Sequence, residues 1–184
     1  MNRSHKIILI SHCLLNANSK IRGAALYGTV LLPVIEFLLK KDVGIVQLPC
    51  PEHSFAGESR WGQSKDQYNN PFYRNHCRKL IQPVMYQLKD YLEQGYIVLG
   101  VVGIKGSPSC GVKHTYRACW GGEMSGKKGE KIFQEGYLAK EPGVFIEVFS
   151  GILAEEKIDL PFVEVDEENL PDTLKVLDSL FISQ

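Results

Sequence analysis

The chain lacks a long apolar run. None of its 184 residues belongs to a stretch near the roughly 20 consecutive apolar residues that a membrane-spanning helix needs. The apolar run at residues 7–10 is also shorter than the ~7–15 residues of the apolar region of a secretory signal, and His12 and Cys13 follow it. We therefore expect a soluble, cytoplasmic protein that does not associate with a membrane.

The chain also lacks an excess of charge of either sign. Its 21 Lys and Arg are balanced by 21 Asp and Glu. This balance excludes the broad basic surface with which proteins bind a nucleic-acid duplex without specificity, and it removes a general attraction to anionic lipid. A hydrophobic share of 44% and a charged share of 23% are typical of a folded globular chain.

Cysteine is present, but not in a pattern that suits disulfides. The number is odd, no export signal is visible, and the chain is long for a disulfide-stapled scaffold. No pair has the Cys-x-x-Cys spacing that predicts a zinc or ferredoxin-type site. In a reducing compartment, such thiols are packing residues, ligands or nucleophiles. They are Cys13, Cys50, Cys77, Cys110 and Cys119.

Apolar patterns alternate between strand and helix along the chain. Short apolar runs predict strands, and apolar stripes with a spacing of three or four predict helices. The expected strands are 6–11, 44–48, 96–104 and 162–165, and the expected helices are 29–41, 71–93, 144–156 and 170–181. Pro171 suits a first turn, Pro33 is expected either in a first turn or at a kink, and Pro83 is expected to kink its helix. The strand 96–104 is the most apolar and is placed at the centre of the sheet.

This order predicts one α/β domain over residues 1–184. We expect an open, mostly parallel sheet with helices on both faces, in a Rossmann-like layout. No repeat or change in composition marks a second domain. Residues 106–143 lack a clear period and are expected to form a long functional loop, with a short helix near 130–134. The glycines at 100–106 have the wrong spacing for a dinucleotide fingerprint.

Three cysteines share one place in this topology. Cys13, Cys50 and Cys110 each come just after a predicted strand. Ligands of open parallel sheets bind beyond the carboxyl ends of the strands, so these thiols are expected to converge. Prolines around Cys50, and a proline and a glycine around Cys110, predict rigid turns that would hold metal ligands in place. The alternative is that each thiol is a small buried packing residue.

Three soft thiolates suit an iron–sulfur cluster or zinc better than magnesium or calcium. A [4Fe–4S] cluster with three protein ligands keeps one iron open to a substrate atom. A fourth cysteine ligand would close that position and favour electron transfer. We interpret Cys77 as a packing residue of the long helix, and Cys119 as a packing residue or a resolving thiol. Both remain candidates for a fourth ligand.

Three motifs resemble those of the thiouracil desulfurase family. They are Cys-Leu-Leu-Asn at 13–16, Cys-Pro-Glu at 50–52 and Ser-Pro-Ser-Cys-Gly at 107–111. Their order and spacing match those of the family, and residues 141–149 resemble its C-terminal helix, which a strand follows. The set of three motifs is more specific than any one of them.

The resemblance implies a single α/β domain whose [4Fe–4S] cluster is held by Cys13, Cys50 and Cys110. It also implies that the open iron binds the sulfur of a small thiolated base such as 2-thiouracil, and that water replaces this sulfur. The overall reaction is not a redox reaction, so no external electron donor is implied. The segments after the first two motifs, 21–23 and 53–61, depart from the family pattern. A divergent, desulfurase-related branch is therefore expected.

Hydrolysis of a carbon–sulfur bond needs a group that moves a proton. Glu52 is the first candidate for this role, with a surface carboxylate or a helix cap as the alternative. Ser107 and Ser109 are candidate hydrogen-bond donors to substrate or cluster, with ordinary turn chemistry as the alternative. His12 is a further acid–base candidate, although we favour an ordinary structural role.

Other side chains could contact an anionic or planar ligand. Lys113, His114 and Arg117 are candidates for a small positive patch, with an ordinary solvated loop as the alternative. Stacking on a planar base is expected from aromatic residues, which could equally pack in the core. The aromatic candidates are Trp61, Phe72 and Trp120.

Two other functions remain open at this point. One is a hydrolase in which Cys13 is the nucleophile, activated by His12 or His114; it accounts for one of the three strand-end thiols. The other is a non-catalytic metal-binding module that senses iron or redox state. The oligomeric state is not predicted, although exposed edge strands or an apolar helix face could support a dimer.

Overall fold

The inner strands of the sheet are β1 (Lys6–Ile10) and β3 (Ile97–Ile104), and their side chains are largely buried on both faces. The structure is a computed structural model that describes residues 3–122, 125 and 136–181. Strand β2 (Gly44–Gln47) pairs with β1, and β6 (Phe162–Val165) pairs with β3, all in parallel. The predicted α/β fold with a parallel sheet is therefore confirmed.

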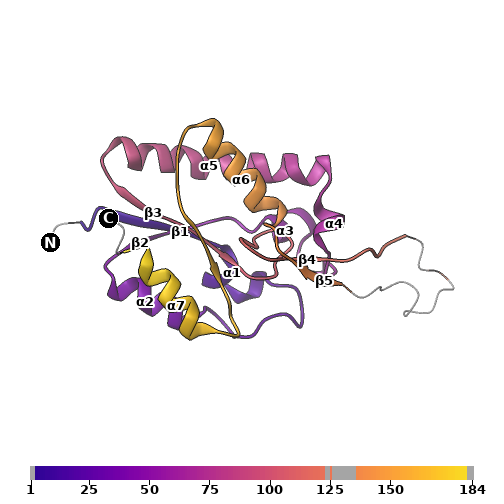
Figure 1. Cartoon of the computed structure of the whole chain (residues 1–184). Coiled ribbons are helices and arrows are strands. Elements are labelled where there is room, and N and C mark those ends of the chain that lie inside the picture. The colour runs from indigo at the N-terminus through magenta and orange to yellow at the C-terminus, as the bar shows by residue number, and fades with distance from the viewer. Residues whose placement is uncertain (1–2, 123–124, 126–135, 182–184) are drawn as a thin grey trace.

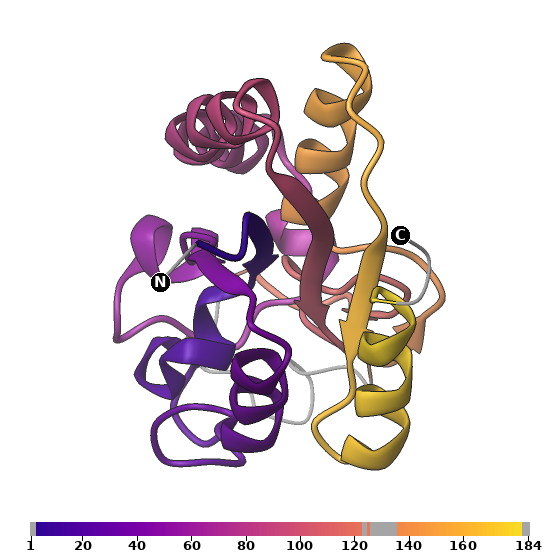
Figure 2. The same ribbon diagram turned by 90° about the vertical axis from the view of Figure 1, so that its left-hand side faces the viewer.

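Helices cover the sheet on both faces (Figures 1 and 2). Helices α2 (Leu32–Lys40) and α7 (Leu170–Ser179) pack together on one face, and α5 (Pro71–Glu93) and α6 (Val144–Glu155) pack together on the other. All four were expected from their apolar stripes, and α5 continues as a helix across Pro83. Burial on both faces explains why the inner strands read as continuous apolar runs.

Short elements after the strands were not predicted. They are α1 (His12–Leu15), the 3₁₀ turn η1 (Ala17–Ser19), α3 (Pro51–Ala56) and α4 (Lys65–Tyr68). None is long enough to show a helical period in the sequence. Two of them, α1 and α3, begin shortly after β1 and β2 end at the carboxyl edge of the sheet.

The expected irregular loop at 106–143 contains a small hairpin, so that expectation was incomplete. Strands β4 (Thr115–Arg117) and β5 (Tyr137–Ala139) pair in antiparallel fashion, beyond the carboxyl end of β3 (Figure 1). Strands of three residues leave little alternation for a sequence pattern to reveal. The short helix expected at 130–134 lies outside the described residues.

The Ser-Pro-Ser-Cys-Gly turn packs with its backbone directly on β3 and on the start of α6. A Cβ atom at Gly103 would lie 2.4 Å from the carbonyl oxygen of Cys110, and one at Gly143 would lie 2.5 Å from that of Ser109. The N–H of Phe145, in the first turn of α6, donates to Ser109 O at 3.0 Å. The two glycines thus allow the turn to lie against the end of the sheet.

Substitution of Gly103 is expected to disturb this contact. Gly103→Ala forces the turn away from β3 and should lower the free energy of unfolding by about 1–3 kcal/mol. Gly151→Ala is the matched control, because Gly151 lies in α6 with open space around it. This variant should raise the free energy of unfolding by about 0.5–1 kcal/mol. Denaturant unfolding measures both, and equal midpoints for the two variants would contradict the expectation.

A buried ion pair ties α4 to α6. The side chain of Lys65 is 2% exposed, and its ammonium contacts Glu147 at 2.5 Å and Glu141 at 3.2 Å. It also donates to Pro142 O at 2.7 Å. Gln63, two residues earlier, lines the pocket described below, so the ion pair anchors the chain close to that pocket.

Removal of the buried ammonium should cost more than removal of an exposed one. Lys65→Met is expected to lower the free energy of unfolding by about 1–3 kcal/mol, because carboxylates lose a buried partner. Lys89→Met is the control, since the Lys89–Glu156 pair is 37% and 40% exposed and should change stability by less than about 1 kcal/mol. Similar unfolding midpoints for the two variants would contradict this ranking.

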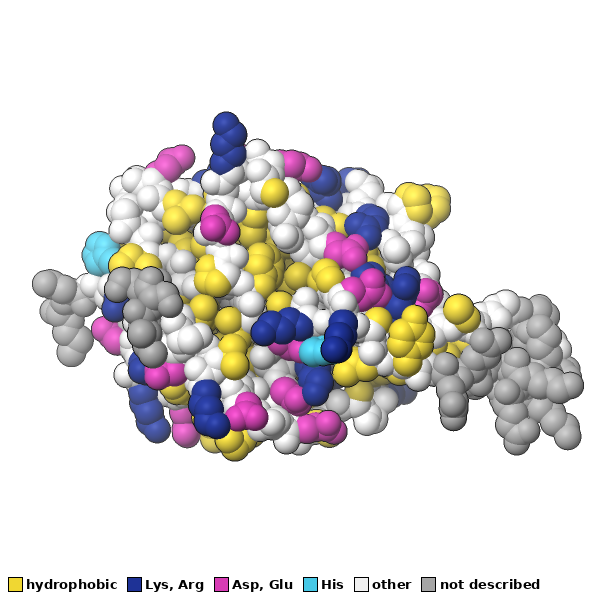
Figure 3. Space-filling view, in the orientation of Figure 1, with side chains coloured by type: hydrophobic (Ala, Val, Ile, Leu, Met, Phe, Trp, Pro, Cys, Tyr) yellow, Lys and Arg dark blue, Asp and Glu magenta, His cyan; other side chains and the backbone are white. Residues whose placement is uncertain are grey.

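The surface is mixed in charge. Acidic and basic side chains are interspersed over the face shown in Figure 3, as the balanced composition predicts. Within the described ranges, no helix combines the length and the apolar character that a bilayer span requires.

Candidate functional site

A pocket of about 500 Å³ opens at the carboxyl edge of the sheet. Three of its lining residues are Cys13, Cys50 and Cys110, which arrive after β1, β2 and β3. The structure therefore brings together the three strand-end thiols that the topology predicted to converge. The site follows from the parallel arrangement, because neighbouring strands end at the same edge.

Each thiol is held by a short local structure. Cys13 lies in α1, and the hydroxyl of Tyr27 donates to its carbonyl oxygen at 2.9 Å. Cys50 is the N-cap of α3, where Pro51 begins the helix and the N–H of His53 donates to the Cys50 sulfur at 3.4 Å. The N–H of Cys110 donates to the Ser107 hydroxyl at 2.9 Å. The Pro- and Gly-framed turns thus position the sulfur atoms.

The thiols share one poorly solvated space. Burial raises the pKa of Cys13 to about 12. Burial, followed by the charges of Cys13 and Cys50, holds the pKa of Cys110 well above its usual value. Burial likewise raises the pKa of Cys50. Thiols in this setting ionise when a nearby cationic group stabilises the thiolates, as a bound metal centre does.

The donor set fits an iron–sulfur cluster. Among the residues that the structure describes, no group of three or more His, Cys, Asp and Glu is spaced to hold a single metal ion. Ligands of a cubane bind different irons and stand farther apart than ligands of one ion. Three soft sulfur donors at the end of rigid turns match the ligand type that such clusters use.

Neither of the other two cysteines lines this pocket. Cys77 is fully buried within α5, and Cys119 is exposed in the segment after β4. The interpretation of Cys77 as a packing residue agrees with this placement. Among the cysteines of the described residues, the pocket lining therefore holds Cys13, Cys50 and Cys110.

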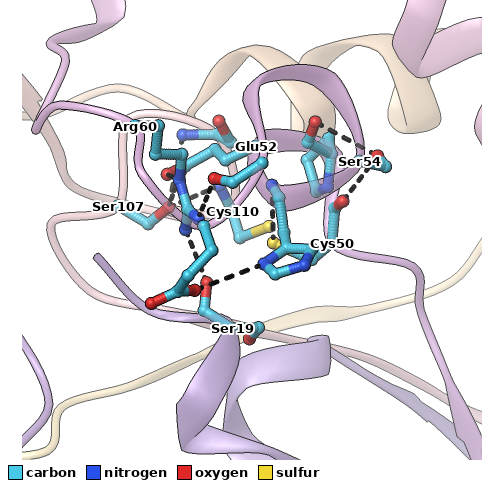
Figure 4. A network of polar contacts seen from close by, with 12 residues as sticks. Ser19, Cys50, Glu52, Ser54, Arg60, Ser107 and Cys110 are labelled. Carbon is cyan, nitrogen blue, oxygen red and sulfur yellow. Dashed lines mark hydrogen bonds and ion pairs between the residues drawn. The ribbon is translucent and has the colours of Figure 1, made fainter. Parts of the chain in front are cut away.

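Glu52 lines the pocket and contacts one ion-pair partner and one hydrogen-bond donor (Figure 4). The guanidinium of Arg60 lies 3.6 Å from one carboxylate oxygen, and the Ser107 hydroxyl donates to the other at 3.4 Å. Burial raises the pKa of Glu52, and Arg60, Ser109 and Ser107 oppose that rise. The carboxyl group is therefore held in place near the thiols.

Arg60 is a site residue that the sequence did not indicate. Its side chain is buried and donates to the carbonyl oxygens of Gly57 and Ser19. Its contact with Glu52 depends on the chain folding back after α3 (Figure 4). No spacing rule predicts such a return.

The two serines of the third motif have different surroundings. Ser107 lines the pocket, and its hydroxyl contacts Glu52 and the N–H groups of Ser109 and Cys110. Ser109 is fully buried, and its hydroxyl lies 2.7 Å from that of Tyr73. Ser109, expected to contact substrate or cluster, is not among the lining residues; its side chain acts on the site through Glu52, whose raised pKa it helps to lower.

A second charged pair, which the sequence also did not indicate, borders the pocket near Cys13. Lys20, which follows η1, contacts Glu167, which follows β6. The Lys20 ammonium also lies 4.8 Å from the ring centre of Tyr27. The pair joins segments that are distant in sequence, and neither residue belongs to a recognisable motif.

Two of the three residues of the expected positive patch are paired with carboxylates. His114 lies 2.7 Å from Glu164, and Arg117 lies 3.2 Å from both Asp66 and Glu141. Of the three residues of that patch, none lines the pocket. The prediction of an anion-attracting patch there is therefore not supported by the arrangement.

The aromatic candidates separate into one pocket residue and two surface residues. Trp120 lines the pocket, and its ring centre lies 5.7 Å from that of Tyr116, a second lining residue. Trp61 and Phe72 are exposed and are not among the lining residues. His12 does not line the pocket either, and burial lowers its pKa.

The fold and site define an α/β protein with three cysteines in one pocket at the carboxyl edge of a parallel sheet. The chain is 36% identical over 110 residues to the uncharacterized protein MJ0003 of Methanocaldococcus jannaschii, a match that covers 60% of this chain and 70% of that protein. The chain therefore belongs to the same family as MJ0003. No family model matches the sequence, and no solved structure matches it.

Proposed function

We propose that this protein is a desulfurase that removes sulfur from a small thiolated heterocycle, with a [4Fe–4S] cluster held by Cys13, Cys50 and Cys110. The observation that carries the proposal is the convergence of these three thiols in one pocket. The motif resemblance to thiouracil desulfurases supports the same assignment. A small heterocycle such as 2-thiouracil suits a pocket of about 500 Å³. The pocket lining includes the aromatic residues Tyr116 and Trp120.

When bound, such a cluster supplies one iron without a protein ligand, which can polarise a thiocarbonyl sulfur. Residues of the chain itself bind the ring and place it next to the thiols and Glu52. The rings of Tyr116 and Trp120 are tilted by 43° to each other, so a planar ring in the pocket can pack against the face of one of them. The thiols and the carboxyl group of Glu52 border the same space, so a ring placed there has its sulfur and its reacting carbon within reach of both.

Glu52 moves the proton in this reaction. A water molecule adds its oxygen to the ring carbon, the carbon–sulfur bond breaks, and hydrogen sulfide leaves. The products are the oxo base and hydrogen sulfide, so no electron is gained or lost overall. Glu52 accepts one proton of the attacking water and passes it to the sulfur; as the carbonyl forms and the carbon–sulfur bond breaks, it takes the remaining proton from the added hydroxyl and passes that to the departing sulfur as well. Arg60 and Ser107 hold the carboxylate in the required orientation.

The direct test uses protein purified without oxygen. Iron and acid-labile sulfide are measured, and the protein is then incubated with 2-thiouracil while uracil and sulfide are followed. We expect about four irons and four sulfides per chain and equal amounts of uracil and sulfide. A protein that takes up no iron under reconstituting conditions would contradict the cluster, and a loaded protein inert toward thiolated bases would contradict the activity.

The alternatives have less support from the site. A nucleophilic cysteine needs a lowered pKa and a base beside it, whereas burial raises the pKa of Cys13 to about 12. Neither His12 nor His114 is a lining residue. A sensor with a fully ligated cluster would need a fourth ligand, and Cys77 and Cys119 both lie outside the pocket.

A further inference from the structure

Two ion pairs line the pocket, and they differ in how much of their hydrogen-bonding capacity the protein itself uses. In the Glu52–Arg60 pair, the carboxylate contacts Arg60 and Ser107, and the guanidinium donates to two backbone carbonyl oxygens. In the Lys20–Glu167 pair, the ammonium has one oxygen partner among the described residues, a carboxylate oxygen of Glu167. Since an ammonium carries three N–H donors, this second pair keeps donors for a ligand.

The backbone and side chain of Lys20 are both held in place. Its N–H donates to Ala17 O at 3.0 Å, and the preceding carbonyl oxygen, Ser19 O, accepts from the guanidinium of Arg60. The side chains of Lys20 and Glu167 are 10% and 13% exposed. The pair is therefore ordered before a ligand arrives, which lowers the entropic cost of binding.

Tyr27 places the ammonium of Lys20 on the Cys13 side of the pocket. The ammonium lies 4.8 Å from the centre of the Tyr27 ring, and the hydroxyl of the same side chain donates to Cys13 O at 2.9 Å. One aromatic side chain thus connects the ammonium to the backbone of a proposed cluster ligand. A small base with its sulfur at the thiols can present a neighbouring edge of its ring to this pair.

An ammonium and a carboxylate side by side are complementary to one particular chemical group. The ammonium donates hydrogen bonds and the carboxylate accepts them, so together they match a ring edge on which C=O stands next to N–H. In 2-thiouracil, the oxo group and the ring N–H beside it form such an edge, and that N–H is also bonded to the thiocarbonyl carbon. Hydrogen bonds with one charged partner are stronger than neutral ones.

We propose that the Lys20–Glu167 pair determines substrate specificity: its ammonium donates to the ring oxygen of a thiolated cyclic amide, and its carboxylate accepts from the adjacent ring N–H. The inference rests on the proposed function for the reaction, and it narrows the substrate class to thiolated bases that carry an oxo group next to a ring N–H. A thiolated ring without that edge leaves the spare donors of a largely buried ammonium unpaired, which weakens its binding.

The first test compares two substrates of the anaerobically reconstituted protein. 2-Thiouracil carries the proposed edge, and pyrimidine-2-thione lacks it. The ratio of their kcat/KM values is measured in the wild type, Lys20→Met and Lys41→Met. We expect the preference for 2-thiouracil to fall about 10- to 100-fold in Lys20→Met, because the hydrogen bond to the ring oxygen is lost. The intrinsic reactivity of each ring cancels when the ratios of two variants are compared.

Lys41 is the matched control, because its ammonium also combines an ion pair with an aromatic contact and is not among the lining residues. It contacts Asp178 at 2.5 Å and lies 5.4 Å from the centre of the Phe37 ring. Lys41→Met should keep the wild-type ratio. A purely structural role of Lys20 would lower both kcat/KM values alike, so an unchanged ratio in Lys20→Met overturns the proposal.

A second test needs neither cluster nor turnover. Uracil, which keeps the same ring edge, is titrated calorimetrically into the metal-free wild type, Lys20→Met and Lys41→Met. We expect Lys20→Met to bind uracil about 10- to 100-fold more weakly than the wild type, and Lys41→Met to match the wild type. Equal affinities, or no binding of uracil by the wild type, overturn the proposal. A wild type that binds uracil but does not desulfurate 2-thiouracil when loaded would refute the proposed function alone.

Discussion

Replacement of Cys110 by serine should abolish both iron retention and the release of sulfide from 2-thiouracil. A serine hydroxyl is a hard donor that stays protonated, so it does not replace a thiolate. Loss of an outer-shell partner costs about 10–100-fold in metal affinity, and loss of a ligand should cost more than about 100-fold. The same result is expected for Cys13→Ser and Cys50→Ser, which line the same pocket.

The chain provides its own controls for this experiment. Cys77→Ser and Cys119→Ser remove thiols that lie outside the pocket, so both variants should keep their iron. Cys119→Ser should also keep its stability, because its side chain is exposed. Iron and sulfide assays, with circular dichroism to verify folding, decide the outcome. Wild-type iron content in Cys110→Ser would be incompatible with a three-cysteine cluster.

Glu52→Gln should slow sulfide release by about 100- to 10,000-fold while iron content stays unchanged. Glutamine has nearly the same shape and can still accept a hydrogen bond from Ser107, but it cannot accept the proton of water. Glu52 is not a thiol ligand, so the loss should appear in kcat rather than in cluster content. The measurement is single-turnover release of uracil from 2-thiouracil by reconstituted protein.

The control for Glu52→Gln is a nearby carboxylate outside the pocket. Glu58→Gln removes an exposed carboxylate that pairs loosely with Arg22 at 3.7 Å and with His53 at 3.9 Å. It should leave the rate within about twofold of wild type, as surface substitutions do. A Glu52→Gln variant with the full rate would exclude this carboxyl group from the chemistry and direct attention to another proton donor.

The core of the fold was predictable because buried helices and strands show a regular pattern of apolar residues in the sequence. The apolar runs of β1 and β3, and the stripe of α5, identify elements to within a few residues. Parallel topology then places strand ends at one edge, which is why Cys13 and Cys50 could be assigned to one site without any local ligand spacing. That inference needs only strand positions and the direction of the chain.

The other site residues lie in segments whose sequence shows no such pattern. Arg60 contacts Glu52, and Lys20 contacts Glu167, through loops whose paths no hydrophobic period describes. Ser107 and Ser109 belong to one motif, yet one faces the pocket and the other faces Tyr73. Their directions depend on how tightly the turn packs on β3, a property of contacts rather than of residue type.

The three thiols arrive on three separate strands, and this has a consequence for the order of events in the cell. An unfolded chain cannot chelate a cubane, because its sulfurs are scattered along more than half its length. Insertion of the proposed cluster would therefore follow folding, and the cluster would link the segments that follow β1, β2 and β3. A ligand that binds only the native state shifts the folding equilibrium toward that state, so the cluster-loaded protein should unfold less readily than the cluster-free protein.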